Sequence, residues 1–218
     1  MSIVKATIAE QIYDALKEKI RNLEIKPGER IVIDDLAAQF GTSETPIKEA
    51  LLKLTENGLV VSVSRKGFYV VEITPKDVEE IYQLRKMFEI FGIKYGNFDK
   101  ADFEQLKKRM ESLLVEEDQK KKQAIFTQTE KDLHSKLVLM SDNKRLRDLY
   151  FQICVFADIL FHVANKIDRY TKEHIEIVDA IMENDCNKAC LLLEAHMDNG
   201  RDEIKQALDE LMENVRHK

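Results

Sequence analysis

Histidine is the residue type in this sequence with the widest scope for chemistry. The chain has five histidines: His134, His162, His174, His196 and His217. Glu130 precedes His134 by four residues, a spacing that stacks both side chains on one face of a helix. His174 opens a second expected helix, and His196 lies midway along a third. Imidazoles and a carboxylate that met from three helices would suit a Zn, Ni, Fe or Mn ion.

The spacing alone does not identify a metal site. Asp158 and His162 are also four residues apart, and a single helical histidine is more often packed or solvated than bound to a metal. Cys186 and Cys190 share a helical face, so a thiolate site competes with ordinary packing there. A metal hydrolase would use such a centre to activate water. The sequence, however, has no His-Glu-x-x-His pattern and no recognisable pairing of a nucleophile with a base.

A second group of candidate residues is basic and lies in the first seventy residues. Lys48 and Lys53 fall on an expected helix, and Arg65 and Lys66 fall at the tip of an expected hairpin. Such side chains bind DNA phosphates, as do the free amides of a helix N-terminus. A helix that enters the major groove by its N-terminal end would read the bases.

The elements that position these basic residues form a winged helix-turn-helix. Helices are expected over residues 7–22, 33–39 and 43–57. Thr7 and Glu10 have the spacing of a capping box, whereas nothing before residue 33 can cap the second helix. A short turn with Gly41 joins the second helix to the third, which Thr42 or Ser43 caps. Alternating residues from 61 onward, broken by a turn at 65–67, predict a β-hairpin, the wing.

The charge of this first part leaves an alternative open. Residues 1–74 contain 10 basic and 11 acidic side chains, a net charge of −1. Most DNA-binding domains have a basic surface. A winged helix used only for protein contacts is therefore the alternative interpretation.

The remaining residues are expected to form an all-helical domain. Thr74-Pro75-Lys76-Asp77 has a cap, a proline at the first helical position and an acid in the first turn, so the domain boundary is placed at residues 73 and 74. Six helices are expected, over residues 75–95, 100–117, 119–141, 143–166, 170–184 and 185–215. The predicted fold is mainly α: a winged helix-turn-helix over residues 1–73 and a six-helix antiparallel bundle over residues 74–218.

Composition excludes several classes of protein. Of 218 residues, 44% are hydrophobic and 34% charged, which supports a sizeable core and argues against disorder. The net charge of −6 argues against a protein that coats nucleic acid by charge alone. Three cysteines fit a reducing compartment. No apolar run is long enough to span a membrane, and residues 1–10 lack a signal-peptide core, so a cytoplasmic location is expected.

The first seventy residues resemble the DNA-binding head of GntR-type bacterial transcription regulators. The resemblance rests on Pro27-Gly28-Glu29-Arg30-Ile31, Leu36-Ala37, Phe40-Gly41-Thr42-Ser43, Thr45 to Leu51, Leu54 and Gly58-Leu59-Val60. It implies that the DNA-binding residues are Ser43, Glu44, Thr45, Lys48, Lys53, Arg65, Lys66 and Gly67. Two positions depart from the family pattern, since the family usually has arginine where Glu44 and Lys48 stand. Glu44 would repel phosphate but can accept a hydrogen bond from cytosine N4, and Lys48 lacks the bidentate fork of arginine.

The second part resembles the FCD ligand-binding domain of FadR-type GntR regulators. The resemblance rests on Arg85 to Glu89, Asp132-Leu133-His134, Ser141-Asp142-Asn143, Glu173-His174 and Asp185 leading to Ala195-His196. Six helices rather than seven place it nearer the VanR-like branch. In many such domains one Asp and three His bind a divalent metal. The matching positions here are Glu130, His134, His174 and His196, with Glu in place of Asp. A metal-free polar effector pocket is the alternative.

The resemblance also implies an effector and an assembly. In the family the metal usually completes a pocket for a small carboxylate. We expect Arg85 to face that anion, although an ion pair with Glu89 is an equal alternative. His162 is a further candidate for the pocket. The expected protein is a non-enzymatic, ligand-responsive regulator, by default a repressor. It would bind a palindromic operator as a homodimer, with Zn the ion expected on isolation. A DNA-binding dimer without an effector is the alternative.

Overall fold

The computed structural model describes residues 6–160 and 166–216, and the side chains of residues 6–153 and 166–209. His162 lies outside the described residues. The chain divides into two compact units, Met1–Ile73 and Thr74–Lys218.

The first helix of the N-terminal unit, α1 (Ile8–Arg21), begins at the predicted capping box. The Thr7 side chain accepts a hydrogen bond from the Glu10 amide, and the Glu10 carboxylate accepts one from the Thr7 amide. The helix buries Ile12, Leu16 and Ile20 at helical spacing against α3. Local sequence signals and the apolar periodicity therefore both specify this helix.

The helix-turn-helix consists of α2 (Ile33–Phe40) and α3 (Glu44–Glu56). Gly41 ends α2 in the left-handed conformation, at a φ of 62°, which glycine adopts without steric cost. Ser43 stands at the N-cap of α3 but makes no capping hydrogen bond with its side chain. The buried face of α3 consists of Ile47, Ala50, Leu51 and Leu54. The opposite face is exposed from the first turn onward.

The wing is a small antiparallel sheet with the strand order β1-β3-β2. The predicted hairpin forms from β2 (Val60–Val63) and β3 (Gly67–Val70), with Arg65 and Gly67 at positive φ in the turn. The two-residue strand β1 (Arg30–Ile31) pairs with β3, Arg30 opposite Tyr69 and Ile31 opposite Phe68. The sequence does not predict β1, because two residues are too few to show an alternating pattern.

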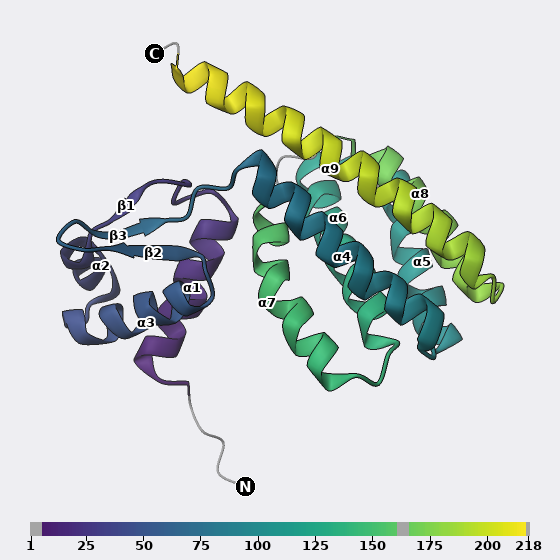
Figure 1. Ribbon diagram of the computed structural model, residues 1–218, viewed down its shortest axis with the longest axis horizontal. Coiled ribbons are helices and arrows are strands. Elements are labelled where there is room, and N and C mark those ends of the chain that lie inside the picture. The colour runs from purple at the N-terminus through teal and green to yellow at the C-terminus, as the bar shows by residue number, and fades with distance from the viewer. Residues whose placement is uncertain (1–5, 161–165, 217–218) are drawn as a thin grey trace, which may run out of the picture. The chain divides into compact units, whose positions relative to one another are not determined.

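In the described residues of the C-terminal unit, helices are the regular secondary structure, joined by short loops. Its helices are α4 (Pro75–Tyr95), α5 (Lys100–Leu114), α6 (Gln119–Leu139), α7 (Lys144–Leu160), α8 (Ile167–Met182) and α9 (Cys186–Arg216). Helix α4 packs along α9 and also contacts α6 and α7, while α8 packs against α9 and α5 (Figure 1). The prediction of a winged helix-turn-helix followed by six helices is confirmed. None of the helices in the described part is long and apolar enough to span a membrane.

Within the described residues, two predicted helix ends differ from the structure by three residues. Helix α5 ends at Leu114 rather than near residue 117, because Asp118 already caps α6 by accepting hydrogen bonds from the amides of Lys120 and Lys121. Helix α8 begins at Ile167, three residues earlier than expected. Its N-cap residue, Lys166, makes no side-chain capping bond, so no local signal marks that start.

Glycines let α4 and α6 approach closely. A Cβ atom on Gly92 would lie 1.7 Å from the carbonyl oxygen of Leu137, and one on Gly96 would lie 2.4 Å from the carbonyl carbon of Met140. Only glycine fits these positions without displacing a helix. The close crossing brings the middle of α4 against the segment of α6 that contains Glu130 and His134.

Candidate metal centre

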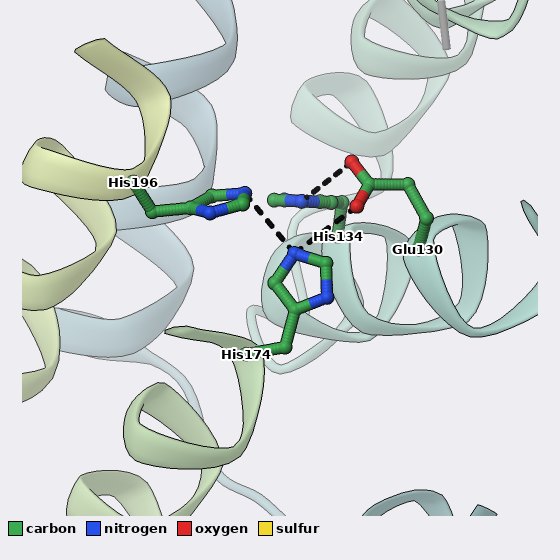
Figure 2. Close-up of side chains that lie close together, drawn as sticks. All are labelled: Glu130, His134, His174 and His196. Atoms are coloured by element: carbon green, nitrogen blue, oxygen red, sulfur yellow. Dashed lines mark hydrogen bonds and ion pairs between the residues drawn. The ribbon is translucent and has the colours of Figure 1, made fainter. Parts of the chain in front are cut away.

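Four side chains from three helices converge inside the C-terminal unit. Glu130 and His134 come from α6, His174 from α8 and His196 from α9 (Figure 2). One potential ligand atom of each lies within 4.8 Å of the others. All four residues are buried, with His174 fully enclosed and His196 the most exposed at 5%. The four residues that the family resemblance selected therefore lie together.

The distances place Glu130 and His174 at the centre of this cluster. Glu130 Oε1 lies 3.0 Å from His134 Nε2, and Glu130 Oε2 lies 3.0 Å from His174 Nε2. His174 Nε2 is also 3.1 Å from His196 Nε2. The Nε2 atoms of all three imidazoles thus point into the same small volume (Figure 2).

Two further carboxylates fix the orientation of two of the imidazoles. Glu89 Oε2, on α4, lies 2.5 Å from His134 Nδ1, and Glu173 Oε2, on α8, lies 2.8 Å from His196 Nδ1. A carboxylate accepts, so each Nδ1 carries a proton and donates it. In the neutral imidazole, Nε2 then carries a lone pair that points to the centre of the cluster. A carboxylate behind a histidine is the usual support of a histidine metal ligand.

Burial and neighbouring charges shift the pKa values of the cluster. Burial opposes ionisation of Glu130, but the imidazoles of His134 and His174 outweigh it and hold the pKa of this carboxyl well below its usual value. Burial opposes protonation of His134, but Glu89 and Glu130 outweigh it and raise its pKa. Burial and the adjacent His174 lower the pKa of His196 to about 4, so this ring is neutral at neutral pH.

The hydrogen bonding of the cluster fits a bound cation. Within the described part of the chain, His134 Nε2 is buried and has no hydrogen-bond partner of acceptable geometry, although Glu130 is near. When their rings are neutral, His134 and His196 present Nε2 lone pairs to the same small volume, which a Glu130 oxygen also borders. One carboxylate oxygen with three imidazole nitrogens is a donor set that Zn, Ni, Fe or Mn accepts. The residues present therefore fit a divalent metal ion.

Arg85 contacts the back of this cluster. Its Nε donates to Glu89 Oε1 at 3.1 Å, and its Nη2 lies 3.8 Å from Glu130 Oε1. Arg85 and Glu89 are 1% and 0% exposed, and the Tyr150 hydroxyl donates to the same Glu89 oxygen. The contact between Arg85 and Glu89 is the alternative that the sequence left open. The supporting roles of Glu89, Glu173 and Tyr150 are not predicted from the sequence.

A weak signal for two of those supporting residues was present in the sequence. Glu89 lies four residues after Arg85, and Glu173 directly precedes His174. Their contacts with His134 and His196 join different helices, so spacing along the chain does not reveal them. Helix α9 contains two cysteines that the structure describes, and both are free thiols. Cys186 is exposed and Cys190 is buried, and neither belongs to the cluster.

The N-terminal unit presents most of the predicted DNA-binding residues on exposed surfaces. Ser43, Glu44, Thr45 and Lys48 are exposed at the start of α3. The ammonium of Lys48 lies 2.5 Å from the Glu44 carboxylate, one helical turn away.

The remaining predicted DNA-binding residues divide between two places. Lys53, near the end of α3, lies over the Tyr13 ring at 4.7 Å, which directs it toward α1. Arg65 and Lys66 are exposed at the tip of the hairpin, next to Gly67.

Comparisons with known proteins match both units. Residues 8–70 match the family described as bacterial regulatory proteins, gntR family, and residues 80–199 match the FCD domain. An uncharacterized HTH-type transcriptional regulator, YdhC of Bacillus subtilis, is 31% identical, with 94% of each chain covered. A probable D-xylose utilization operon transcriptional repressor of Paenarthrobacter nicotinovorans is 25% identical over 84% of this chain and 82% of its own.

The fold also matches solved structures. One match is the crystal structure of a putative transcriptional regulator GntR from Rhodococcus sp. RHA1, with 24% sequence identity and a TM-score of 0.75. The match covers 90% of this chain and 96% of that one. E. coli McbR/YncC is 21% identical, with a TM-score of 0.73 and coverage of 93% of this chain and 99% of that one. At these identities the likeness concerns the fold.

Proposed function

The chain belongs to the GntR family of bacterial regulatory proteins and carries an FCD domain, and from this premise we propose that it is a metal-assisted, ligand-responsive repressor. Family membership makes it a transcription regulator rather than the metal hydrolase considered above. The proposal of a metal and an effector rests on the buried cluster of Glu130, His134, His174 and His196. The same chain also presents α3, the recognition helix of the helix-turn-helix, with an exposed face. Repression, rather than activation, is proposed because two of the relatives are named as repressors.

A homodimer is part of this proposal. Two helix-turn-helix heads are needed to read the two half-sites of a palindromic operator. On α4, Leu84, Met87 and Tyr95 are exposed apolar side chains along one side of the helix, and α7 exposes Leu149 and Phe151. An exposed apolar surface of this kind is typical of a subunit interface and supports dimerisation through the helical domain.

The charges around the cluster favour an anionic effector. Arg85 balances one of the two carboxylates, Glu89 and Glu130, that lie beside it in the buried interior. Glu173 is paired separately with Arg169. When bound, a divalent ion supplies a positive centre, and with neutral histidines it leaves the buried group with a net charge of about +1. One small carboxylate would neutralise that charge, which is the effector class that the proposal names. His162 remains a prediction for this pocket.

Glu44 and Lys48 determine which bases of the operator the winged helix-turn-helix would recognise. Both stand at the exposed N-terminal end of α3, the part of a recognition helix that contacts base edges. A carboxylate accepts a hydrogen bond from cytosine N4, and a lysine ammonium donates to guanine O6 or N7. Because the Glu44 acceptor and the Lys48 donor lie next to each other, the pair is suited to a base-pair step that contains a G·C pair. We assign the other phosphate contacts to the helix N-terminus and to Arg65 and Lys66 of the wing.

Recovery of genomic DNA tests the regulator. Purified protein incubated with sheared DNA from the source organism is expected to retain a few fragments that share a palindrome. Lys48→Ala should weaken binding to that site, and Glu44→Arg should change the preferred base at one position of each half-site, by about 1–3 kcal/mol of discrimination. Lys121→Ala, an exposed lysine of the helical domain, is the matched control. Featureless recovery, with and without added Zn²⁺ or Ni²⁺, would contradict the proposed function.

A further inference from the structure

Arg85 and Glu89 have a buried arrangement that an anion-binding role does not explain. We propose that they are positioning residues for the metal site: Arg85 holds Glu89, and Glu89 holds the His134 ring with Nε2 directed at the ion. This inference rests on the proposed metal site and adds the residues that orient it. It also moves Arg85 from the effector pocket to the support of a metal ligand.

The contacts form one continuous chain from the interior to the cluster. Arg85 Nε donates to Glu89 Oε1 at 3.1 Å, the Tyr150 hydroxyl donates to the same oxygen at 3.2 Å, and Glu89 Oε2 lies 2.5 Å from His134 Nδ1. Arg85, Glu89 and His134 are at most 2% exposed, so no solvent competes for these hydrogen bonds. Each Glu89 oxygen therefore has its own partner, and the carboxylate cannot turn away from His134 without losing a buried charge-assisted bond.

The backbone crossing fixes the same geometry. Glu89 and Gly92 are three residues apart on α4, and His134 and Leu137 are three apart on α6. The close approach of Gly92 to the Leu137 carbonyl sets the two helices so that the preceding turn brings Glu89 against His134. The positioning contact thus lies one helical turn before the close approach of Gly92 to the Leu137 carbonyl.

Stability alone gives little reason for such an arrangement. Burying an ion pair costs desolvation that its attraction often only offsets, and apolar residues of similar size are frequently as stable. Here the interior holds a second carboxylate as well, because Glu130 lies 3.8 Å from Arg85. An orienting carboxylate behind a metal-binding histidine has a function that an apolar side chain cannot supply, since it fixes both the tautomer and the ring direction.

The chain contains its own comparison for this role. Glu173 makes the same kind of contact with His196, at 2.8 Å, but its side chain is 21% exposed and its partner Arg169 is 43% exposed. Asn199 also donates to Glu173, at 3.3 Å. Water and Asn199 can replace part of what Glu173 provides, whereas the Glu89 side chain is 0% exposed, so water does not reach it in this arrangement. We therefore expect Glu89 to matter more for metal binding than Glu173.

Metal affinity in the absence of any carboxylate ligand tests the inference. Zn²⁺ binding to the full-length protein is measured by competition with a chromophoric chelator, in a buffer that does not coordinate metals. Glu89→Gln should lower the affinity about 10–100-fold, and Glu173→Gln should lower it less. The Co²⁺-loaded protein should also show a changed visible spectrum in Glu89→Gln, which a purely structural role would leave unaltered once the variant is folded.

Arg85→Lys distinguishes a positioning role of Arg85 from an anion-binding role. It also replaces Glu89→Gln as the test if that variant does not fold. It keeps the charge but loses the fork that fits the Glu89 carboxylate. A positioning role predicts weaker binding of Zn²⁺ alone, whereas an anion-binding role predicts unchanged Zn²⁺ affinity. Wild-type affinity in folded Glu89→Gln, or in Arg85→Lys, would overturn the inference. Failure of the wild-type protein itself to bind Zn²⁺ would instead overturn the metal site on which the inference rests.

Discussion

Protein purified without chelator is expected to carry about one divalent ion per chain, and His134→Ala or His196→Ala is expected to carry almost none. The reason is geometric, because each substitution removes one of the imidazoles that converge on the Glu130 carboxylate. Inductively coupled plasma mass spectrometry of the purified chains gives the ratio. Added Zn²⁺ should also raise the melting temperature of the wild type, since a ligand at 100 times its Kd stabilises the folded state by about 2.7 kcal/mol.

Cys186→Ser is the matched control for the loss of metal. Cys186 is exposed and lies outside the cluster, so its replacement should leave the metal content unchanged. Loss of the ion in Cys186→Ser, with retention in His134→Ala, would show that a thiolate site binds the metal. A wild-type protein that contains no ion, and whose melting temperature Zn²⁺, Ni²⁺ and Mn²⁺ do not change, would contradict the proposed centre.

Gly92→Ala is expected to destabilise the helical domain strongly. The new Cβ would lie 1.7 Å from the Leu137 carbonyl oxygen, which belongs to the backbone and cannot rotate away. Helices α4 and α6 must then separate, which should cost about 3 kcal/mol or more, at the upper end of the usual range for overpacking or above it. Thermal unfolding followed by circular dichroism should show the melting temperature fall by roughly 6–12 °C.

Gly200→Ala provides a comparison at another helical glycine. Its Cβ would meet the Tyr82 hydroxyl at 3.1 Å, the end of a side chain rather than backbone. The gain in helix propensity, about 1 kcal/mol, opposes that crowding, so the net change should be small. Equal melting temperatures for Gly92→Ala and the wild type would refute the account of the α4–α6 crossing.

Helix starts with strong local signals could be predicted from the sequence. The capping box of Thr74 and Asp77, with Pro75 at the first helical position, marks the start of α4 at the predicted residue. Helix α8 has no such signal at Lys166, and it begins three residues before the start that the sequence predicts. The strand β1 exists only because β3 lies beside it, so no pattern within residues 30–31 could reveal it.

The candidate site was predictable only in part. The spacing of Glu130 and His134 follows from helical geometry, but the selection of His174 and His196 rested on the family resemblance. Glu89 and Glu173 could not be assigned, because their contacts with the imidazoles depend on how separate helices pack.

The predicted DNA-binding residues of the N-terminal unit were likewise predictable only in part. Basic residues on α3 were evident in the sequence, but the pairing of Lys48 with Glu44 and the direction of Lys53 toward Tyr13 are set by the folded surface.

The central claim is that occupancy of the buried site changes the affinity of the head for its operator. The most direct measurement is the Kd for the recovered operator fragment, by fluorescence anisotropy, with metal-free protein, with Zn²⁺, and with Zn²⁺ plus citrate as a probe carboxylate. We expect the Kd to change by about 5-fold or more between two of these states, and not to change in His134→Ala. Identical affinities in all three states, with the ion shown to be bound, would contradict the claim.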